Sequence, residues 1–321
     1  MQFLSSIEST LPILLIIALG YWLRKQGWFA DSFAGNLSKL ILNIALPAGI
    51  FVSILKYLNR DTLFSLSDGL LYFSLATILA YLAAFLLVKL LKVRRGRQGV
   101  FINVIANANT IFIGLPLNVA LFGNDSLPYF LVCYLVNTVS TWTIGAWLIA
   151  NDDPTIAPDQ HKGSFDWKKL FTPPLTGALL AFVFLFADIR LPVFISSTLG
   201  YVGELVTPLA LIYVGIVLAD AGLKSIHFDK DAIGALIGRF ILMPVFTIVL
   251  IVFGAGTLGA LPTMEAHTLI VQSAVPALAV LPILVHAANG DVEYATNVVT
   301  TSTLLFIIVI PIVNSLLPFI G

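Results

Sequence analysis

The stretch Asn107–Leu117 reads Asn-Ala-Asn-Thr-Ile-Phe-Ile-Gly-Leu-Pro-Leu and lies inside a long apolar run. Such a run predicts a membrane helix, yet this one carries two amides, a hydroxyl, a glycine and a proline. Pro116 has no N–H and its ring clashes with the preceding turn, so we expect the helix to kink or break there. Inside a bilayer a broken backbone is tolerated only where it is buried in protein or lines a wet cavity. The stretch therefore predicts either a packing device or a binding site.

The composition of the chain is that of a polytopic membrane protein. Of its 321 residues, 59% are hydrophobic and 11% are charged, whereas soluble domains carry roughly 25% charged residues. The formal net charge is zero, which gives no argument for nucleic acid as a partner. The single cysteine, Cys133, excludes an intramolecular disulfide and a cysteine metal cluster. The first ten residues lack the basic region of a cleaved signal peptide, so we expect the first span to stay.

Hydropathy predicts an all-α protein with ten membrane spans. We expect them at Ile7–Leu23, Leu37–Leu58, Asp68–Leu91, Val100–Phe122, Leu127–Ala150, Leu170–Ala187, Phe194–Ala219, Ala232–Phe253, Thr268–Ala288 and Tyr294–Leu317. The polar segment 151–167, which contains four aspartates, predicts a cytoplasmic linker between a first half, 1–150, and a second half, 168–321.

Lys and Arg residues indicate the orientation, because cytoplasmic loops carry an excess of them. With the N-terminus outside, the inner loops hold thirteen, including the Lys92–Arg97 cluster, and the outer loops hold Lys56, Arg60 and Arg190. We therefore expect a multi-pass protein of the cell membrane with both termini on the non-cytoplasmic side. This topology explains the Lys92–Arg97 cluster better than a lipid or nucleic-acid site does.

The two halves repeat the spacing of their prolines. The pattern Leu-Pro, eight residues, Asp begins at Leu115 and again at Leu281, 166 positions later. Pro47 and Pro208 are 161 positions apart, and each follows a polar residue by four positions. Because each half has an odd number of spans, the second half must enter the membrane in the opposite orientation. The sequence thus predicts a 5+5 inverted repeat with broken fourth and ninth helices.

Broken helices at matching positions of two inverted halves point to a transporter binding site. Helix starts beyond Pro116 and Pro282 would direct free N–H groups and positive dipole ends toward the membrane midplane. The fourth and ninth spans carry no Lys or Arg near these breaks, so we expect an anion site built without a buried cation. Side chains that can bond a ligand, or only satisfy the freed backbone, are Asn107, Asn109, Thr110 and Ser273.

The same residues resemble a known family. Asn109-Thr110-x-x-x-Gly114-x-Pro116-Leu117, followed by Ala120-Leu121-Phe122-Gly123, is similar to the signature of the auxin efflux carriers. That family includes plant PIN carriers and bacterial malate and malonate permeases. Pro276 to Pro282 and Pro311 agree in the second half, so the resemblance covers essentially the whole chain. It implies crossed fourth and ninth helices, a scaffold of spans 1, 2, 6 and 7, and a moving core of spans 3–5 and 8–10.

The resemblance also implies an elevator-like carrier in which Asn109 contacts the carboxylate of the ligand. The substrate-binding residues that we expect are Asn107, Asn109, Thr110, Gly114, Pro116, Ser273, Pro276 and Pro282. The chain departs from the plant carriers in its short linker and in Ile50, where they have a serine. Malate or malonate is therefore favoured as the substrate, and an auxin-like aromatic carboxylate is the alternative. A homodimer through the scaffold helices is an open expectation.

Two further polar residues are candidates for a coupling-ion site. Glu204 is a carboxylate deep in the seventh predicted span, and it could carry a proton or form a structural pair with Arg239 of the eighth. Arg239 could instead extend toward the cytoplasm. Asn43 occupies the corresponding position in the second span. These residues do not decide between H⁺ and Na⁺. His267 and His286 lack the spacing of metal ligands, so we expect no metal.

The leading functional hypothesis is a secondary active transporter for a small organic anion, with the bilayer and the anion as its partners and without a cofactor. A phosphate-binding loop of the type G-x-x-x-x-G-K-[ST] is absent from the sequence, so direct ATP drive has no support. A ligand-binding membrane sensor on the same fold is the alternative from another class. Motifs of membrane-embedded hydrolases are absent as well, and we do not expect an enzyme.

Overall fold

The computed structural model describes residues 2–57, 60–155, 173–222 and 226–320. Within these ranges the regular structure is helical, and the only extended pairing is an isolated antiparallel bridge between Ala108 and Ala277. Most of the expected linker 151–167, and the expected start of the sixth span, lie outside the described residues.

The α-helices are, in chain order, α1 (Gln2–Lys25), α2 (Phe33–Leu40), α3 (Leu46–Tyr57), α4 (Arg60–Leu91), α5 (Gln98–Ala106), α6 (Leu115–Phe122), α7 (Leu127–Ser140), α8 (Ala146–Asn151), α9 (Pro173–Phe186), α10 (Val193–Glu204), α11 (Val206–Ala221), α12 (Lys230–Ile237), α13 (Met243–Leu258), α14 (Thr263–Ser273), α15 (Leu281–Ala287) and α16 (Val292–Leu316). π-helical turns join several of them: η1 (Ile41–Ala45), η2 (Thr110–Gly114), η4 (Thr141–Gly145) and η7 (Gly238–Leu242). The turns η3 (Asn124–Ser126) and η8 (Leu317–Phe319) are 3₁₀-helical.

Six helical segments of the described chain are long and apolar enough to cross a membrane. They are Phe33–Lys56, Leu66–Leu91, Asn124–Asn151, Val193–Asp220, Lys230–Leu258 and Val292–Phe319. Large apolar side chains are exposed on them, for example Leu82, Leu86 and Leu90 along one face of α4. The expectation of a helical, polytopic membrane protein is thereby confirmed, whereas ten spans and the inverted repeat stay predictions.

The fourth and ninth segments are interrupted, but the first interruption lies earlier than the sequence predicts. α5 ends at Ala106 and Asn107 is extended, with φ −113° and ψ 144°. Helical structure resumes at Thr110 and continues through Pro116, which lies in the first turn of α6. The expected break at Pro116 is therefore wrong. In the ninth segment α14 and α15 are separate helices, and Pro282 does lie in the first turn of a new helix, as predicted.

Widened turns explain why these prolines leave the helices continuous. The π-helical turns η1, η2 and η7 each end two residues before a proline, which is Pro47, Pro116 and Pro244 respectively. A proline inside an α-helix removes one N–H and clashes with the carbonyl four residues earlier. In η2 the N–H of Leu115 instead bonds the carbonyl of Thr110, five residues earlier. The extra residue in the turn relieves the clash without breaking the helix.

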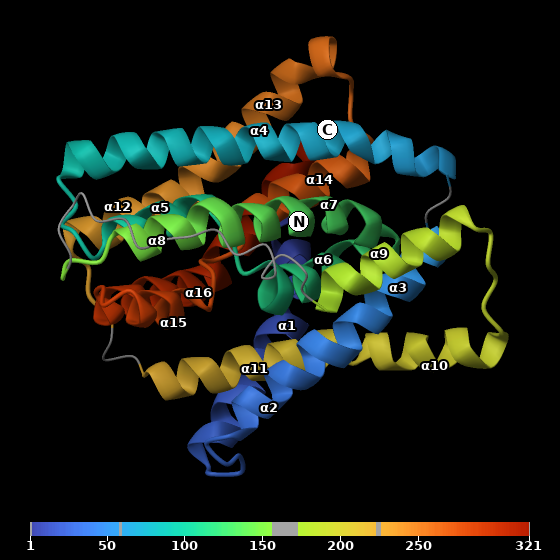
Figure 1. Cartoon of the computed structure of the whole chain (residues 1–321), viewed down its shortest axis with the longest axis horizontal. Helices are drawn as coiled ribbons and strands as arrows, with labels where there is room; N and C mark the ends of the chain where they lie inside the picture. The colour runs from blue at the N-terminus through green and yellow to red at the C-terminus, as the bar shows by residue number, and fades with distance from the viewer. Residues whose placement is uncertain (1, 58–59, 156–172, 223–225, 321) are drawn as a thin grey trace.

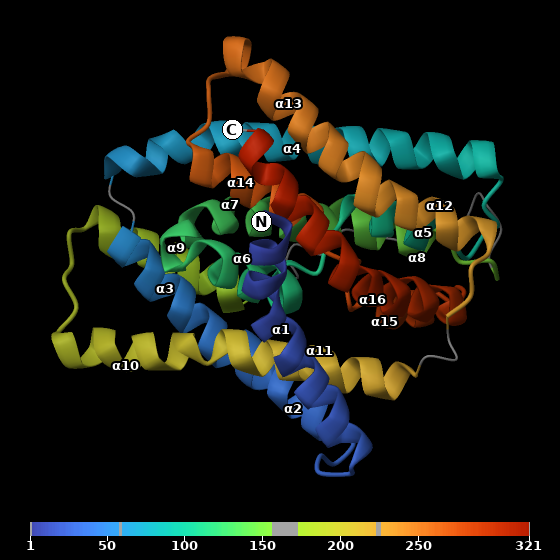
Figure 2. The same ribbon diagram turned by 180° about the vertical axis from the view of Figure 1, so that it is seen from behind.

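The helices form two packed groups (Figures 1 and 2). α1 packs along α11, and α3 packs against α9 and α10. α4 lies on the other side with α5, α7 and α13, and α14 contacts both α13 and α7. Glycine permits one of the close approaches in the first group, because a Cβ on Gly215 of α11 would overlap the backbone of Ile17 and Tyr21 in α1.

One arginine joins the loops at one end of the second group. Nη1 of Arg97 lies 2.6 Å from Oδ2 of Asp229, and its Nε lies 2.7 Å from Oδ2 of Asp291. Burial alone would raise the pKa of Asp291, but the N–H of Tyr294 and the guanidinium groups of Arg97 and Arg94 outweigh it and lower that pKa. The pKa of Asp229 is lowered as well, since the first turn of α12 and Arg97 outweigh its burial. Asp291 therefore joins the α15–α16 turn to the α4–α5 loop.

Candidate functional site

The two interruptions lie against each other. Ala108 and Ala277 form the antiparallel bridge, and the N–H of Asn109 donates to the carbonyl of Pro276 at 2.9 Å. All four residues are buried. The broken fourth and ninth segments thus meet backbone to backbone, as the resemblance implies for crossing helices, and each supplies partners for the other's freed backbone groups.

Two neighbouring helices complete the hydrogen bonding of the interruptions. Oδ1 of Asn137, in α7, accepts from the N–H of Ala108 at 2.7 Å, while its Nδ2 donates to the carbonyl of Ala108 at 3.0 Å. The amide side chain therefore pairs with Ala108 as the backbone of a neighbouring strand would. In α16, Oγ of Ser302 accepts from the N–H of Ala277 at 3.2 Å. Both interruptions are consequently held in place by polar side chains from outside them.

A buried arginine lies behind the crossing. Arg239 of η7 is 1% exposed. Its Nε donates to the carbonyl of Val275 at 2.7 Å and its Nη1 to that of Ile105 at 3.1 Å. Its Nη2 donates to the carbonyls of Ser273 and Gln272 at 2.6 and 3.3 Å. These carbonyls belong to the C-terminal ends of α5 and α14, where the helix dipoles concentrate negative charge, so the backbone itself compensates the buried cation.

Arg239 overturns two expectations. It neither pairs with Glu204 nor extends to the membrane surface, because its guanidinium is bound to carbonyls at the crossing. A cation does lie near the breaks, although it comes from the eighth segment and donates its hydrogen bonds to backbone carbonyls. Glu204 is exposed at the end of α10 instead, where it lines a separate cavity of about 440 Å³ between α3, α6 and the start of α11.

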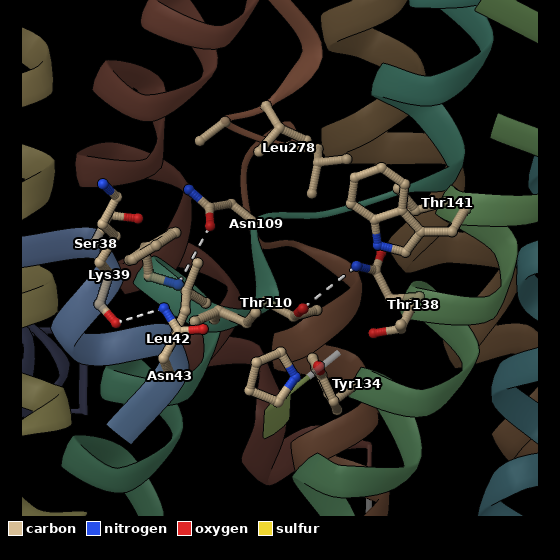
Figure 3. Close-up of a pocket in the computed structure, with 17 residues that line it drawn as sticks. Ser38, Lys39, Leu42, Asn43, Asn109, Thr110, Tyr134, Thr138, Thr141 and Leu278 are labelled. Atoms are coloured by element: carbon tan, nitrogen blue, oxygen red, sulfur yellow. Dashed lines mark hydrogen bonds between the residues drawn. The ribbon is translucent and has the colours of Figure 1, made fainter. Parts of the chain in front are cut away.

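A cavity of about 240 Å³ lies beside the crossing (Figure 3). It is far larger than the roughly 10–15 Å³ that one water needs on the same measure. Its wall comes from α2 and η1, from η2, from α7 and η4, and from the segment 278–280 before α15. The side chains around it are Ser38, Lys39, Leu42, Asn43, Asn109, Thr110, Ile111, Phe112, Tyr134, Asn137, Thr138, Thr141, Trp142, Pro173, Leu278, Ala279 and Val280.

The polar lining of this cavity consists of amides, hydroxyls and one amine. Oδ1 of Asn109 accepts from the N–H of Phe112 at 3.3 Å, which caps η2, and its Nδ2 group is left toward the cavity (Figure 3). Oγ1 of Thr110 accepts from Nδ2 of Asn137 at 3.3 Å. Among the described residues that line the cavity, Lys39 is the only one that carries a charge. These residues thus offer hydrogen-bond donors and a positive group to a ligand, and none of them is a carboxylate.

The structure separates the predicted substrate residues into two sets. Asn109 and Thr110 line the cavity, and so does Asn43, whose Nδ2 donates to the carbonyl of Lys39 at 2.9 Å. The residues outside its lining are Asn107, Gly114, Pro116, Ser273, Pro276 and Pro282. The binding of a substrate by any of them stays a prediction.

Asn107 is turned toward a polar network behind the cavity. Its Nδ2 donates to the hydroxyl of Tyr81 and to Oδ1 of Asn103, both at 2.8 Å, and its Oδ1 accepts from Oγ of Ser140. Every hydrogen-bonding group of the Asn107 side chain is therefore engaged by α4, α5 and α7. These bonds fix the Asn107 side chain at the end of α5.

Gly114 and Ser273 likewise serve the crossing from behind. The carbonyl of Gly114 accepts from Nε2 of Gln272 at 2.9 Å, and a Cβ on Gly114 would overlap this amide. Oγ of Ser273 donates to the carbonyl of Ile270 within α14 at 2.6 Å. Pro276 contributes its carbonyl to Asn109. The close approach of α14 to η2 is thus why glycine is needed at position 114.

The residues that the sequence analysis missed come mainly from α7 and η4. Asn137, Thr138, Thr141 and Trp142 line the cavity, and Lys39 faces it from α2. The run Asn-Thr-Val-Ser-Thr at 137–141 places one amide and three hydroxyls inside an otherwise apolar span, and this was the available signal. Lys39 gave none, because a lysine near the end of a span is explained by topology alone.

Comparison with known proteins places this geometry in a family. A family model described as membrane transport protein matches residues 5–314. The chain is 24% identical over 311 residues to the uncharacterized transporter MJ1031 of Methanocaldococcus jannaschii, a match that covers 94% of this chain and 96% of that one. It is 25% identical over 317 residues to an uncharacterized transporter of Methanothermobacter thermautotrophicus, covering 97% and 98%. The uncharacterized transporter YfdV of Escherichia coli K12 is 27% identical over 248 residues, covering 74% and 76%.

Proposed function

The chain belongs to the membrane transport protein family, the auxin efflux carriers whose signature its fourth span resembles, and on that premise we propose that it carries a small organic anion across the cell membrane. The relatives are named only as transporters, so the substrate class is inferred from the cavity. The protein acts as a secondary transporter rather than an enzyme and uses no cofactor. Its termini lie on the non-cytoplasmic side, and the scaffold helices offer a surface for a second copy.

The observation that carries the proposal is the charge of the cavity at the crossing. Of the lining residues that the structure describes, Lys39 is the only charged one, and it is positive. The amide of Asn109 and the hydroxyls of Thr110, Thr138 and Thr141 surround the same space. Asn109 caps η2, which begins at Thr110, so the positive end of the η2–α6 dipole lies at this cavity as well. A carboxylate is the ligand that such a set of donors favours.

A short dicarboxylate such as malate or malonate suits this arrangement. One carboxylate would lie at Asn109 and the start of η2, and the other would reach Lys39 at the exposed side of the cavity. Hydroxyl donors between these two points favour a polar linker over a long hydrocarbon chain. The aromatic alternative has its own support, since Phe112, Tyr134 and Trp142 also line the cavity and provide faces on which an indole ring can stack.

Two cavities on either side of a thin barrier support alternating access. Phe112 and Asn43 line the cavity at the crossing, whereas Leu115 and Leu46 line the larger cavity that holds Glu204. In both chain segments the change from one cavity to the other takes three residues, about 4.5 Å along a helix. A shift of the α4–α5–α7–α13–α14 group by one or two turns against α3 and α11 would carry Asn109 past this barrier. We therefore infer an elevator-like motion, with the cavity at the crossing open to the cytoplasm in this state.

Uptake by proteoliposomes tests the proposal. Purified protein should exchange internal malate or malonate for labelled malate. Lys39→Met removes the charge and should raise the half-saturating concentration of malate by about tenfold or more. Asn109→Ala should have an effect of similar size, because hydrogen bonds to charged groups contribute about 1.5–3 kcal/mol. Lys89→Met, at an exposed lysine outside the cavity, is the matched control.

The panel of labelled anions separates the alternatives. If indole acetate moves and the dicarboxylates do not, the aromatic alternative is correct, and Trp142→Ala should then abolish transport. If the protein binds one of these anions without moving it, the sensor hypothesis replaces the transporter. If no organic anion is bound or moved, the proposal fails.

A further inference from the structure

Glu265 is a fully buried carboxylate that the proposed site does not use. It lies in the first turn of α14 and is 0% exposed. Within the described part of the chain, neither Oε1 nor Oε2 has a hydrogen-bond partner. Most other carboxylates are exposed, like Glu204, or bonded, like Asp291 with Arg97. Glu265 therefore combines complete burial with complete lack of partners.

The surroundings of Glu265 are built to accept its side chain. A Cβ on Gly69 of α4 would overlap Oε1 of Glu265, so the space for the carboxyl group exists because position 69 is glycine. Asp68, next to it on α4, acts on Glu265 as a like charge. α7, which carries Tyr129 and Cys133, packs against α14 as well. The group is thus enclosed by α4, α7 and α14.

Among the side chains that the structure describes, the elements around Glu265 bring no cation to it, and η3 adds only the exposed carboxylate of Asp125. α6 and α13, which pack against α14, contain no titratable side chain. His267, two residues after Glu265 on α14, is half-buried beside Phe122 and donates a hydrogen bond to the backbone carbonyl of Leu317, just after α16. An ionised carboxylate with a like-charged neighbour and no partner would be strongly unfavourable in such surroundings. The carboxyl group is therefore held in its neutral, protonated form while it is enclosed.

The position of Glu265 connects it both to the solvent side and to the crossing. Asp68 is half-buried and lies beside the α13–α14 loop, since a Cβ on Gly259 would come within 3.2 Å of its Oδ2. It offers an acceptor between Glu265 and the surface. In the other direction α14 extends eight residues, about 12 Å, from Glu265 to Ser273. The end of this helix bonds Gly114 through Gln272 and Arg239 through its last carbonyls.

We propose that Glu265 is the proton-coupling site of this transporter, an inference that rests on the proposed function. The O–H bond of its carboxyl group forms with a proton from one aqueous side, by way of Asp68, and breaks by releasing that proton to the other side later in the cycle. The neutral form permits the enclosed packing of α4, α7 and α14, and the ionised form requires a state in which the group is hydrated. Because α14 is one continuous helix up to the crossing, the movement of Glu265 and that of the anion site are the same movement.

A proton suits this site better than a sodium ion. Sodium is bound by several oxygen ligands at once, as other hard cations are. In the part of the chain that the structure describes, the carboxyl oxygens of Glu265 lie against Gly69 and have no hydrogen-bond partner, and Asp68 on α4 is the second carboxylate that acts on them. Dependence of transport on Na⁺ at constant pH would therefore contradict the assignment.

The first test uses the unaltered protein. Proteoliposomes containing a pH-sensitive dye, held at zero membrane potential, receive labelled malate outside. One proton should enter with each malate anion, and the interior should therefore become more acidic than that of liposomes without protein. An outside-acid gradient of one pH unit should raise the steady-state accumulation of malate about tenfold. Malate entry with no accompanying proton overturns the inference whatever any variant does.

The second test compares variants. Glu265→Gln imitates the protonated group, so it should keep malate exchange between equal concentrations but lose the response to a pH gradient. Asp125→Asn, at an exposed carboxylate, and Glu204→Gln, in the second cavity, should respond as the parent does. A pH gradient also changes the ionisation of malate, and this effect is the same for every variant. The two controls therefore measure the part of the response that does not depend on Glu265. A full gradient response in Glu265→Gln overturns the inference alone, whereas absence of malate movement in the parent overturns the proposed function and this inference with it.

Discussion

Replacing Arg239 by methionine should destabilise the crossing more than any other single change in the second helix group. Methionine keeps the length and most of the volume of the side chain but brings no donor. Four buried carbonyls, those of Val275, Ile105, Ser273 and Gln272, would lose bonds of 2.6–3.3 Å. These carbonyls lie at or just after the C-terminal ends of α5 and α14, so both helices would lose the hydrogen bonds that hold their ends at the crossing.

The magnitude follows from opposing contributions. A buried polar group left without a partner costs about 1–3 kcal/mol, so four carbonyls cost about 4–12 kcal/mol together. Removal of the guanidinium also removes its desolvation penalty, which is several kcal/mol. The net loss is about 3–5 kcal/mol, the size found when one partner of a buried charged contact is removed. Arg239→Lys keeps the charge, but three donors on one nitrogen cannot span four carbonyls, so it should fall between the parent and Arg239→Met.

Thermal unfolding in detergent measures this loss. Arg239→Met should lower the unfolding midpoint by more than about 5 °C, and the initial unfolding rate should be compared as well because membrane proteins often unfold irreversibly. Arg190→Met, at an exposed arginine, is the control and should leave the midpoint within about 1 °C. An Arg239→Met protein with the midpoint of the parent and unchanged malate exchange would refute the idea that this arginine holds the crossing together.

Three other outcomes are expected. The pKa of Asp291 is lowered in the folded protein, so its contribution to stability is complete above the unfolded value near 3.9 and is lost as pH falls through the folded pKa. The unfolding midpoint of the parent should therefore drop between about pH 5 and pH 3. The midpoint of Asp291→Asn should drop less, and that of Asp125→Asn should follow the parent. Gly215→Val should disrupt the α1–α11 contact, seen as loss of folded protein on size-exclusion chromatography, whereas Gly200→Val, with open space around its Cβ, should not. Asn137→Leu should abolish malate exchange and lower the free energy of unfolding by about 2–4 kcal/mol, because the N–H and the carbonyl of Ala108 both lose their partner. A fully active variant would show that α7 does not hold the fourth segment.

The sequence predicted the interrupted segments and part of the candidate site, and its errors have a local cause. Asn109 and Thr110 were recognised because two polar side chains beside a helix break stand out in an apolar span, and both line the cavity. The sequence predicts a break at Pro116 because an isolated proline disrupts an ideal α-helix. The π-helical turn before it absorbs the missing donor, and a widened turn leaves no mark in composition or periodicity.

The residues that the sequence could not place are those whose partners are distant along the chain. Arg239 lies 34 positions before Ser273 and 134 positions after Ile105, and only the packing of η7 against both helix ends brings it to them. Glu265 looks like an ordinary first-turn acid until α4 and α7 enclose it.

The amino-acid sequence by itself determined the membrane class, the family and the existence of two interrupted segments, because hydropathy, proline and amide patterns act within a few helical turns. Only the tertiary structure decided where the interruptions pair, which amides face the cavity, and which buried charges have partners. Burial and hydrogen bonding depend on the neighbours that a residue meets in space, and in this protein some of those neighbours, such as Ala277 for Ala108 and Arg239 for Ile105, are more than a hundred positions away.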